Sequence, residues 1–140
     1  MLKLLLLVLV GAACVAGPTE QDIENSLAAE LRSVAGAWTG TSTGTNGVLL
    51  EFRLVEGSNG QVSGSGTMKE ANAPSAVPIT VTGTYRQPAL SLTFGGMVYE
   101  GRAVQGAAQG SYTTVGGVGT TLQLTATDFS RSITILLQER

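Results

Sequence analysis

From Trp38 to the end of the chain, apolar and polar residues alternate in short runs that turn residues separate. The clearest example is Val77–Phe94, where two alternating runs flank the connection Arg86-Gln87-Pro88. A period of two directs one set of side chains to a dry face and the other to water, as in a half-buried β-strand. Because the connection is short and contains proline, it favours an antiparallel turn. This segment therefore predicts a central β-hairpin.

The same pattern predicts eight or nine short strands. Asn59-Gly60 is a strong hairpin signal after the alternating run at 50–55. The pair Gly95-Gly96 is expected to separate two strands, and the small residues Gln105–Gln109 are expected to form a turn. The other expected strands start at Trp38 and cover Gln61–Met68, Met97–Val104, Gly110–Val115, Thr120–Thr127 and Ile133–Leu137.

These strands predict an all-β domain over residues 36–140. Consecutive strands with tight loops and no long crossover favour an antiparallel up-and-down meander of about eight strands. Closing the meander into a barrel removes its two exposed edges, and an interior of this size holds side chains or one small ligand. A β-sandwich is the alternative, although it prefers longer connections between its sheets. Gly64 and Gly66 share the apolar phase of their strand, which permits sharp coiling or leaves room for a large side chain opposite.

The first 17 residues have the pattern of a secretory signal. Lys3 precedes an apolar run at Leu4–Val10, which is too short to span a bilayer as a helix, and small residues follow. The end of the segment, Val10-Gly11-Ala12-Ala13-Cys14, resembles the lipobox of bacterial lipoproteins, which implies lipidation at Cys14. Val15 stands after this cysteine in place of Asp, which by the same resemblance favours the outer membrane. The alternative is ordinary signal cleavage near Ala16-Gly17.

An amphipathic helix is expected over residues 18–35. Thr19 is a suitable N-terminal cap, and acidic residues follow it in the first turn. The helix has one narrow apolar stripe, made of Ile23, Leu27, Leu31 and Val34. This stripe is expected to dock on an end or the outer wall of the barrel, with a partner protein or the membrane surface as alternatives.

Composition excludes several classes of function. Charged residues make up 13% of the chain, the net charge is −2, and the basic residues are scattered, so we expect no nucleic-acid partner. The chain has no histidine and one cysteine, which excludes a Ser-His-Asp triad, an intrachain disulfide and a Cys/His metal cage. We therefore expect no enzymatic activity, no cofactor and no metal.

One short motif resembles a known family. A predicted helix followed by Gly36-Ala37-Trp38 on the first strand resembles the calycins, the barrels that include lipocalins, fatty-acid-binding proteins and avidin. Thr127-Asp128-Phe129 resembles the Thr-Asp-Tyr motif of lipocalins. The chain also resembles small bacterial lipoproteins of lipocalin-like shape. The resemblance implies a barrel that binds a small, mostly hydrophobic ligand in its interior.

The candidate ligand-binding residues are six aromatic side chains in the apolar phase. Trp38 is expected to close the floor of the barrel. If the barrel holds a ligand, the three tyrosines are expected to meet around one cavity, because a buried hydroxyl needs a partner and can orient a ligand. The alternative is that these residues only fill a packed core. The six residues are Trp38, Phe52, Tyr85, Phe94, Tyr99 and Tyr112.

Two functions follow from these expectations. The first is an exported, lipid-anchored barrel of the bacterial cell envelope, at the outer membrane facing the periplasm or the surface, that binds a small hydrophobic molecule without catalysis. The second is a protein-interaction module of the envelope, as an assembly component or a protease inhibitor. An open cavity of about 300 Å³ or more would favour the ligand. A filled interior with an exposed apolar patch would favour a protein partner.

Overall fold

The computed structural model describes residues 33–42, 44, 46–112 and 117–140. The chain divides into two units, 1–32 and 33–140. The signal segment, Cys14 and residues 18–32 of the expected helix lie outside the described residues. Ser33–Ala35, at the end of the range expected to be helical, are described and belong to neither a helix nor a strand.

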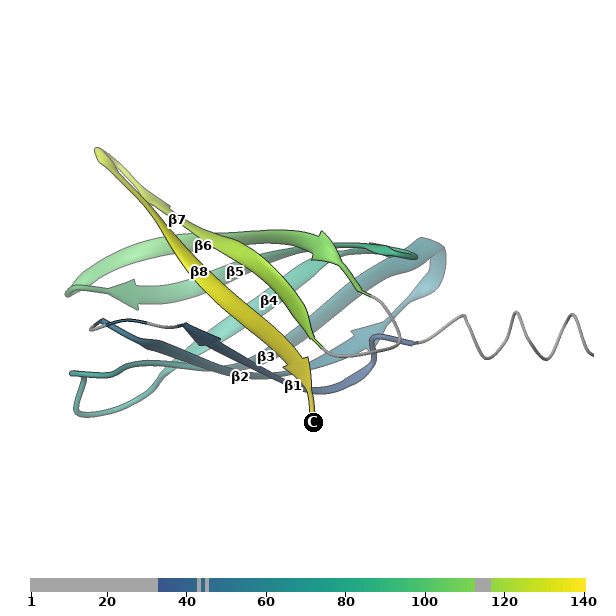
Figure 1. Cartoon of the computed structure of the whole chain (residues 1–140), viewed down its shortest axis with the longest axis horizontal. Coiled ribbons are helices and arrows are strands. Elements are labelled where there is room, and N and C mark those ends of the chain that lie inside the picture. Colours follow the sequence, from purple (N-terminus) through teal and green to yellow (C-terminus); the bar gives the residue numbers. More distant parts are fainter. Residues whose placement is uncertain (1–32, 43, 45, 113–116) are drawn as a thin grey trace, which may run out of the picture. The chain divides into compact units, whose positions relative to one another are not determined.

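Eight antiparallel strands form a closed up-and-down barrel, which confirms the predicted fold class (Figure 1). Each strand pairs with its sequence neighbours, and the first pairs with the last, so the wall has no open edge. The strands are β1 (Gly36–Ser42), β2 (Val48–Glu56), β3 (Gln61–Glu70), β4 (Val77–Arg86), β5 (Ala89–Tyr99), β6 (Arg102–Ser111), β7 (Val118–Ala126) and β8 (Phe129–Glu139).

The two ends of the barrel are named by where its first and last strands start and finish. The terminal end is the one at which β1 begins and β8 ends, and it also holds the β2–β3, β4–β5 and β6–β7 connections. The other four connections lie at the opposite end. The β2–β3 connection contains the 3₁₀ turn η1 (Ser58–Gly60), in which Asn59 and Gly60 have φ values of 60° and 71°. This geometry confirms the Asn-Gly hairpin prediction.

Two boundaries predicted from small residues are wrong. Gly95-Gly96 does not end a strand, because β5 continues through a register shift between Phe94 and Met97, as in a β-bulge. Gln105–Gln109 is not a turn but lies inside β6. The turn is Glu100-Gly101, where both residues have positive φ.

Packing explains why β6 has a glycine at position 106. A Cβ atom added at Gly106 would lie 2.5 Å from the sulfur of Met97 and 3.1 Å from a methyl of Leu122. Large side chains of β5 and β7 thus occupy the space that a larger residue on β6 would need. The final strand is also longer than expected, since it begins at Phe129 rather than after Ser132.

The glycines of β3 and β4 mark where strands approach most closely. A Cβ atom at Gly64 or Gly66 would lie 1.9 Å from a backbone oxygen of β2, and one at Gly83 would lie 1.9 Å from Ser91 O on β5. Gly66 is also the register partner of Phe52. The inward glycines therefore permit both the close coiling and the large opposing side chain that the sequence predicts.

The interior of the barrel is a continuous apolar core. Its members alternate along the strands with exposed or half-buried residues, and no polar or charged residue is fully buried among the described residues. Each fully buried aliphatic or aromatic side chain contributes about 1.5–3 kcal/mol relative to exposure. The largest side chains under 2% exposed include Trp38, Tyr99, Phe94, Leu50, Leu54 and Met68.

Candidate functional site at the terminal end of the barrel

Five of the six predicted ligand residues form one chain of ring contacts inside the barrel. They come from β1, β2, β4, β5 and the residue that follows β6. The ring centroids are 5.5 Å apart for Phe94 and Phe52, 6.5 Å for Phe52 and Trp38, 5.1 Å for Trp38 and Tyr112, and 6.0 Å for Tyr112 and Tyr85. Such spacings are those of interacting aromatic pairs.

Tyr99 lies apart from this aromatic chain. It is buried at the opposite end of the barrel, where its ring centroid is 6.3 Å from that of Phe129 and its hydroxyl accepts a 3.2 Å hydrogen bond from Arg131 Nη1. The expectation that the three tyrosines meet around one cavity is therefore wrong in geometry. The reason is that β5 does not stop at its glycine pair, and its eleven residues carry Tyr99 to the opposite end at about 3.4 Å per residue.

Trp38 closes the floor of the terminal end, as the sequence predicts. Its side chain is 1% exposed, and its indole Nε1 donates a 2.8 Å hydrogen bond to Val34 O. Val34 is itself fully buried in the core. The backbone N–H of Val34 and the hydroxyl of Ser33 both donate to Glu56 Oε1. The segment before β1 is thereby held across the terminal end.

Tyr112 joins two strands at the same end. Its buried hydroxyl donates a 2.5 Å hydrogen bond to Glu139 Oε2 on β8. Its backbone N–H donates a 2.7 Å bond to Pro88 O in the β4–β5 connection. A hydrogen bond to a carboxylate is about twice as strong as a neutral one, so Tyr112 is held firmly by both its backbone and its side chain.

Tyr85 has the polar group that the fold leaves unsatisfied. Its hydroxyl oxygen is buried, and it has no hydrogen-bond partner in the described part of the chain. Burial raises the pKa of this phenol above its ordinary value of 10.0, and the negative charge of Glu56 raises the pKa further. A buried hydroxyl without a partner costs about 1–3 kcal/mol, so this atom is suited to a hydrogen bond from a bound molecule.

The aromatic residues fill the interior. We describe four hollows of 260, 310, 450 and 500 Å³, and none of these four is lined by any of the six candidate residues. Among the described residues, the interior has the apolar packing of the alternative interpretation.

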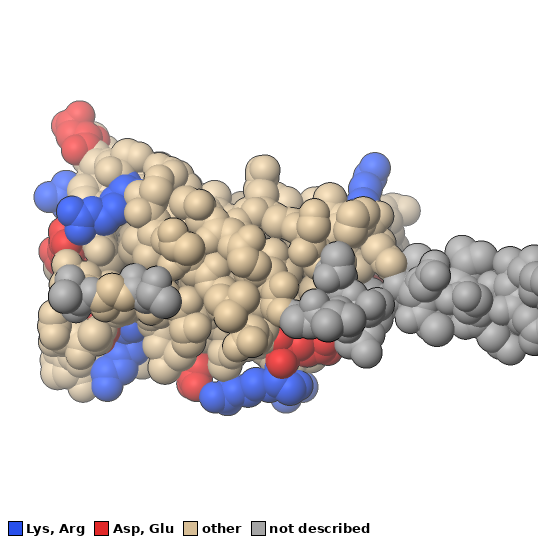
Figure 2. Space-filling view, in the orientation of Figure 1, with Lys and Arg blue, Asp and Glu red and all other residues tan. Residues whose placement is uncertain are grey.

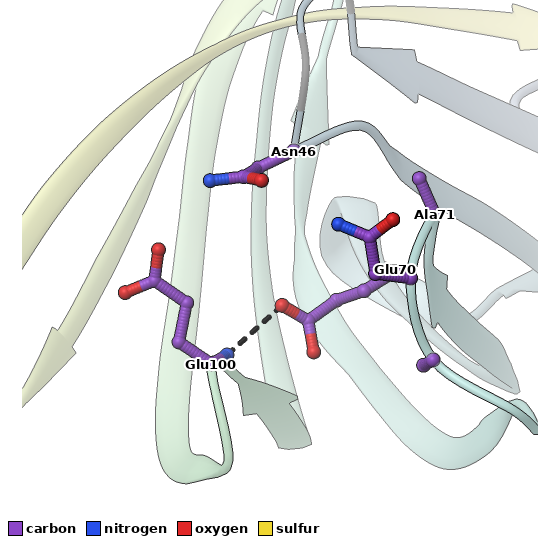
Figure 3. Close-up of a pocket in the computed structure, with 6 residues that line it drawn as sticks. Asn46, Glu70, Ala71 and Glu100 are labelled. Carbon is purple, nitrogen blue, oxygen red and sulfur yellow. Dashed lines mark hydrogen bonds between the residues drawn. The ribbon is translucent and has the colours of Figure 1, made fainter.

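The 260 Å³ hollow lies among the loops of the opposite end (Figure 3). Glu100 N–H donates a 2.9 Å hydrogen bond to Glu70 Oε1, while the carboxylate of Glu100 pairs with Arg131 at 2.7 Å. Exposed pairs of this kind contribute about 0–1 kcal/mol. The hollow is lined by Asn46, Glu70, Ala71, Asn72, Ala73 and Glu100.

Figure 2 shows charged side chains at the left end and along the lower edge of this face, a basic side chain at the upper right, and a broad uncharged expanse in the middle. Near the C-terminus, Arg140 pairs with Glu51 at 2.9 Å. At the opposite end, the Arg102 guanidinium lies 4.7 Å from the ring centroid of Phe129. In the described residues, no helix has the length and apolar character needed to cross a membrane.

Sequence reasoning missed an apolar row on the outer wall. Leu49 of β2 and Leu136 of β8 are 39% and 40% exposed, and both are register partners of Thr41 on β1. A 310 Å³ hollow is lined in part by Thr41 and Leu49. The available signal was the Leu-Leu doublet, Leu49-Leu50 and Leu136-Leu137, because adjacent residues of a strand face opposite sides.

Comparison with protein-family models, curated proteins and solved structures finds no match for this chain. The class that the structure defines is thus architectural: a closed, eight-stranded, antiparallel up-and-down β-barrel, compatible with a lipocalin-like shape.

Proposed function

We propose that this protein is a non-catalytic, calycin-like binding protein for a small hydrophobic molecule. In this proposal it is exported to the bacterial cell envelope and anchored through lipid on Cys14, at the outer membrane facing the periplasm or the surface. The signal-like segment 1–17 and its lipobox support export and anchoring. The closed barrel and its aromatic interior support binding of an apolar molecule.

The unpartnered hydroxyl of Tyr85 is the observation that carries this proposal. It lies beside the aromatic chain, which offers apolar contact, and it can both donate and accept a hydrogen bond. The chemistry that fits is a mostly apolar molecule with one hydrogen-bonding group. Such a molecule would satisfy Tyr85 while its apolar body packs against Trp38 and Tyr112.

Native mass spectrometry of the protein purified from its own host tests this proposal. We expect a co-purifying apolar molecule in the wild type. Tyr85→Phe should weaken its binding about 2- to 13-fold, which corresponds to one hydrogen bond of about 0.5–1.5 kcal/mol. Tyr99→Phe, a matched change at the opposite end of the barrel, should leave binding unchanged. Equal effects of the two variants, or no bound molecule in the wild type, would contradict the proposal.

A protein partner is the second candidate function. The packed apolar interior and the exposed row Leu49–Thr41–Leu136 both favour it. In this case the barrel is an assembly component of the envelope or a protease inhibitor, and the row contacts the partner. Leu49→Ser with Leu136→Ser should then abolish recovery of that partner by crosslinking in envelopes. Val55→Ser is the matched control, because Val55 is 59% exposed near the other end of β2. Crosslinks that survive the double change would exclude this row as the contact.

A further inference from the structure

The backbone ladder between β6 and β7 is incomplete at the terminal end. Its register runs from Gln105↔Thr125 to Ala108↔Leu122 and stops there, although β6 continues to Ser111 and β7 begins at Val118. On its other side, each strand stays paired over these residues, β6 with β5 and β7 with β8. We call residues 109–111 and 118–121 the seam, because these parts of β6 and β7 are neighbours without a paired register.

Two contacts hold the seam in place of a ladder. The hydroxyl of Thr120 donates to the backbone oxygen of Gln109, which in a continuous antiparallel ladder would accept from a backbone N–H of β7. On the inner side, a Cβ atom at Gly110 would lie 2.4 Å from Val118 Cγ1, so Val118 packs directly on this glycine. One side-chain hydroxyl and one apolar contact thus replace the missing rungs.

The outer side of the seam is hollow. The 500 Å³ depression on the wall follows both strands, and a Cβ atom at Gly119 would meet nothing within 4 Å. Nothing in the described residues therefore buttresses β7 from outside at this point. The depression is lined by Ala107, Gln109, Gly119, Thr120, Thr121 and Gln123.

The inner side of the seam leads to the candidate ligand site. Tyr112 follows the last residue of β6, and its ring contacts both Trp38 and Tyr85. Separation of β6 from β7 requires the hydroxyl of Tyr112 to leave Glu139 on β8, and it opens a path beside Tyr112 to the unpartnered hydroxyl of Tyr85. The places where backbone pairing is missing are also those that open at the lowest free energy.

We propose that the β6/β7 seam is the entrance of the barrel, through which a small apolar molecule reaches Tyr85. This inference rests on the proposed function, because an entrance is needed only if the barrel takes up a ligand. The seam opens when Thr120 releases Gln109, Val118 slides from Gly110 and the hydroxyl of Tyr112 leaves Glu139. The ladder at 105–108 and 122–125 stays closed as a hinge.

Hydrogen exchange tests the opening without any ligand. In the seam, some backbone amides of β6 point toward β7 and some of β7 point toward β6. We expect these amides to exchange at least 10-fold faster than those of the β6/β7 ladder. Thr120→Val, which replaces the hydroxyl with a methyl group, should speed their exchange further, whereas Thr120→Ser, which keeps the hydroxyl, should not. If the seam amides were as well protected from exchange as those of the ladder, the proposal that the seam is the entrance would be contradicted.

A matched pair of disulfides tests entry. In a Cys14→Ser background, Gln109→Cys with Thr121→Cys pins the seam, while Ala107→Cys with Gln123→Cys pins the existing ladder two residues away. The probe is the apolar fluorophore N-phenyl-1-naphthylamine, followed by stopped flow. Oxidation of the seam pair should slow probe association at least 10-fold, reduction should restore it, and the ladder pair should have no effect.

The outcomes separate the two proposals. Association that is equally fast with the oxidised seam would overturn the entrance and leave the binding function standing. A wild-type protein that binds no probe and carries no host molecule would contradict the proposed function, and hydrogen exchange would still decide whether the seam opens. If the seam pair does not form a disulfide, the variants at Thr120 provide the test. We expect the probe to associate faster with Thr120→Val than with Thr120→Ser. Equal association rates would contradict the proposal that the seam is the entrance.

Discussion

The hydroxyl of Tyr112 donates a 2.5 Å hydrogen bond to Glu139 and so ties the residue after β6 to the end of β8. Tyr85, whose ring lies 6.0 Å away, has a buried hydroxyl with no partner in the described part of the chain. The two neighbouring tyrosines therefore differ: the hydroxyl of Tyr112 is satisfied within the barrel, and that of Tyr85 is the group to which we assign a hydrogen bond with a ligand in the proposed function.

Tyr→Phe at these two positions should give different stabilities. Tyr112→Phe removes a hydrogen bond to a carboxylate and should lower the free energy of unfolding by about 1.5–3 kcal/mol. Tyr85→Phe removes a hydroxyl that has no partner, so without ligand it should be neutral or slightly stabilising. Urea denaturation of both variants measures the difference. A larger loss in Tyr85→Phe than in Tyr112→Phe would contradict the assignment.

Alkaline pH should destabilise the barrel through Tyr85. The pKa of this phenol is raised in the folded state, first by burial and then by Glu56. The unfolded chain therefore loses the proton first, and stability falls as pH rises from the ordinary pKa of 10.0 toward the folded value. Urea midpoints at pH 9 and pH 11 should show a smaller loss in Tyr85→Phe than in wild type. Equal losses in the two proteins would show that Tyr85 is not the group.

Trp38→Ala should destabilise the barrel by about 3–5 kcal/mol, because it leaves a large cavity in a packed core. It also removes the indole bond to Val34 and the ring contacts to Phe52 and Tyr112. Trp38→Phe keeps an aromatic ring and should cost less. Chemical denaturation of both variants measures the effect, and a loss below about 1 kcal/mol for Trp38→Ala would be inconsistent with a floor residue.

Two glycines offer a matched test of strand approach. Gly66→Ala places a Cβ atom 1.9 Å from Glu51 O, so it should cost about 3 kcal/mol or more or prevent folding. Gly119→Ala meets nothing within 4 Å and should change stability by less than about 1 kcal/mol. Thermal unfolding of the two variants compares them, and equal stabilities would refute the close approach at Gly66.

Cys14→Ser should move the protein from the membrane fraction of its host to the soluble or unprocessed pool. The reason is that acyl chains provide the proposed attachment, and two or more chains are needed for stable anchoring. Cell fractionation with immunoblotting measures the distribution. Ala16→Ser, a small change outside the lipobox, is the control. A variant that stays in the membrane fraction would disprove lipid anchoring at Cys14.

The sequence alone determined the architecture, because a repeated period of two with tight turns leaves few alternatives to an antiparallel meander. It also placed all six aromatic residues in the inward phase, since that phase follows from alternation alone. The strand limits at Gly95-Gly96 and Gln105–Gln109 were not predictable in the same way. Gly106 must be small because Met97 and Leu122 approach it in the closed barrel, whereas Gly95 and Gly96 lie close to Thr80 and Pro78 of β4.

Only the tertiary structure decided which aromatic residues meet. The height of a residue along the barrel depends on strand length and register, and these separate Tyr99 from Tyr85 and Tyr112 although all three share one phase. The same is true of the seam, since β6 and β7 both alternate well enough to predict a continuous pair. Whether Gln109 receives a backbone N–H or the hydroxyl of Thr120 depends on how closely two twisted strands approach, and no local pattern in the sequence records that distance.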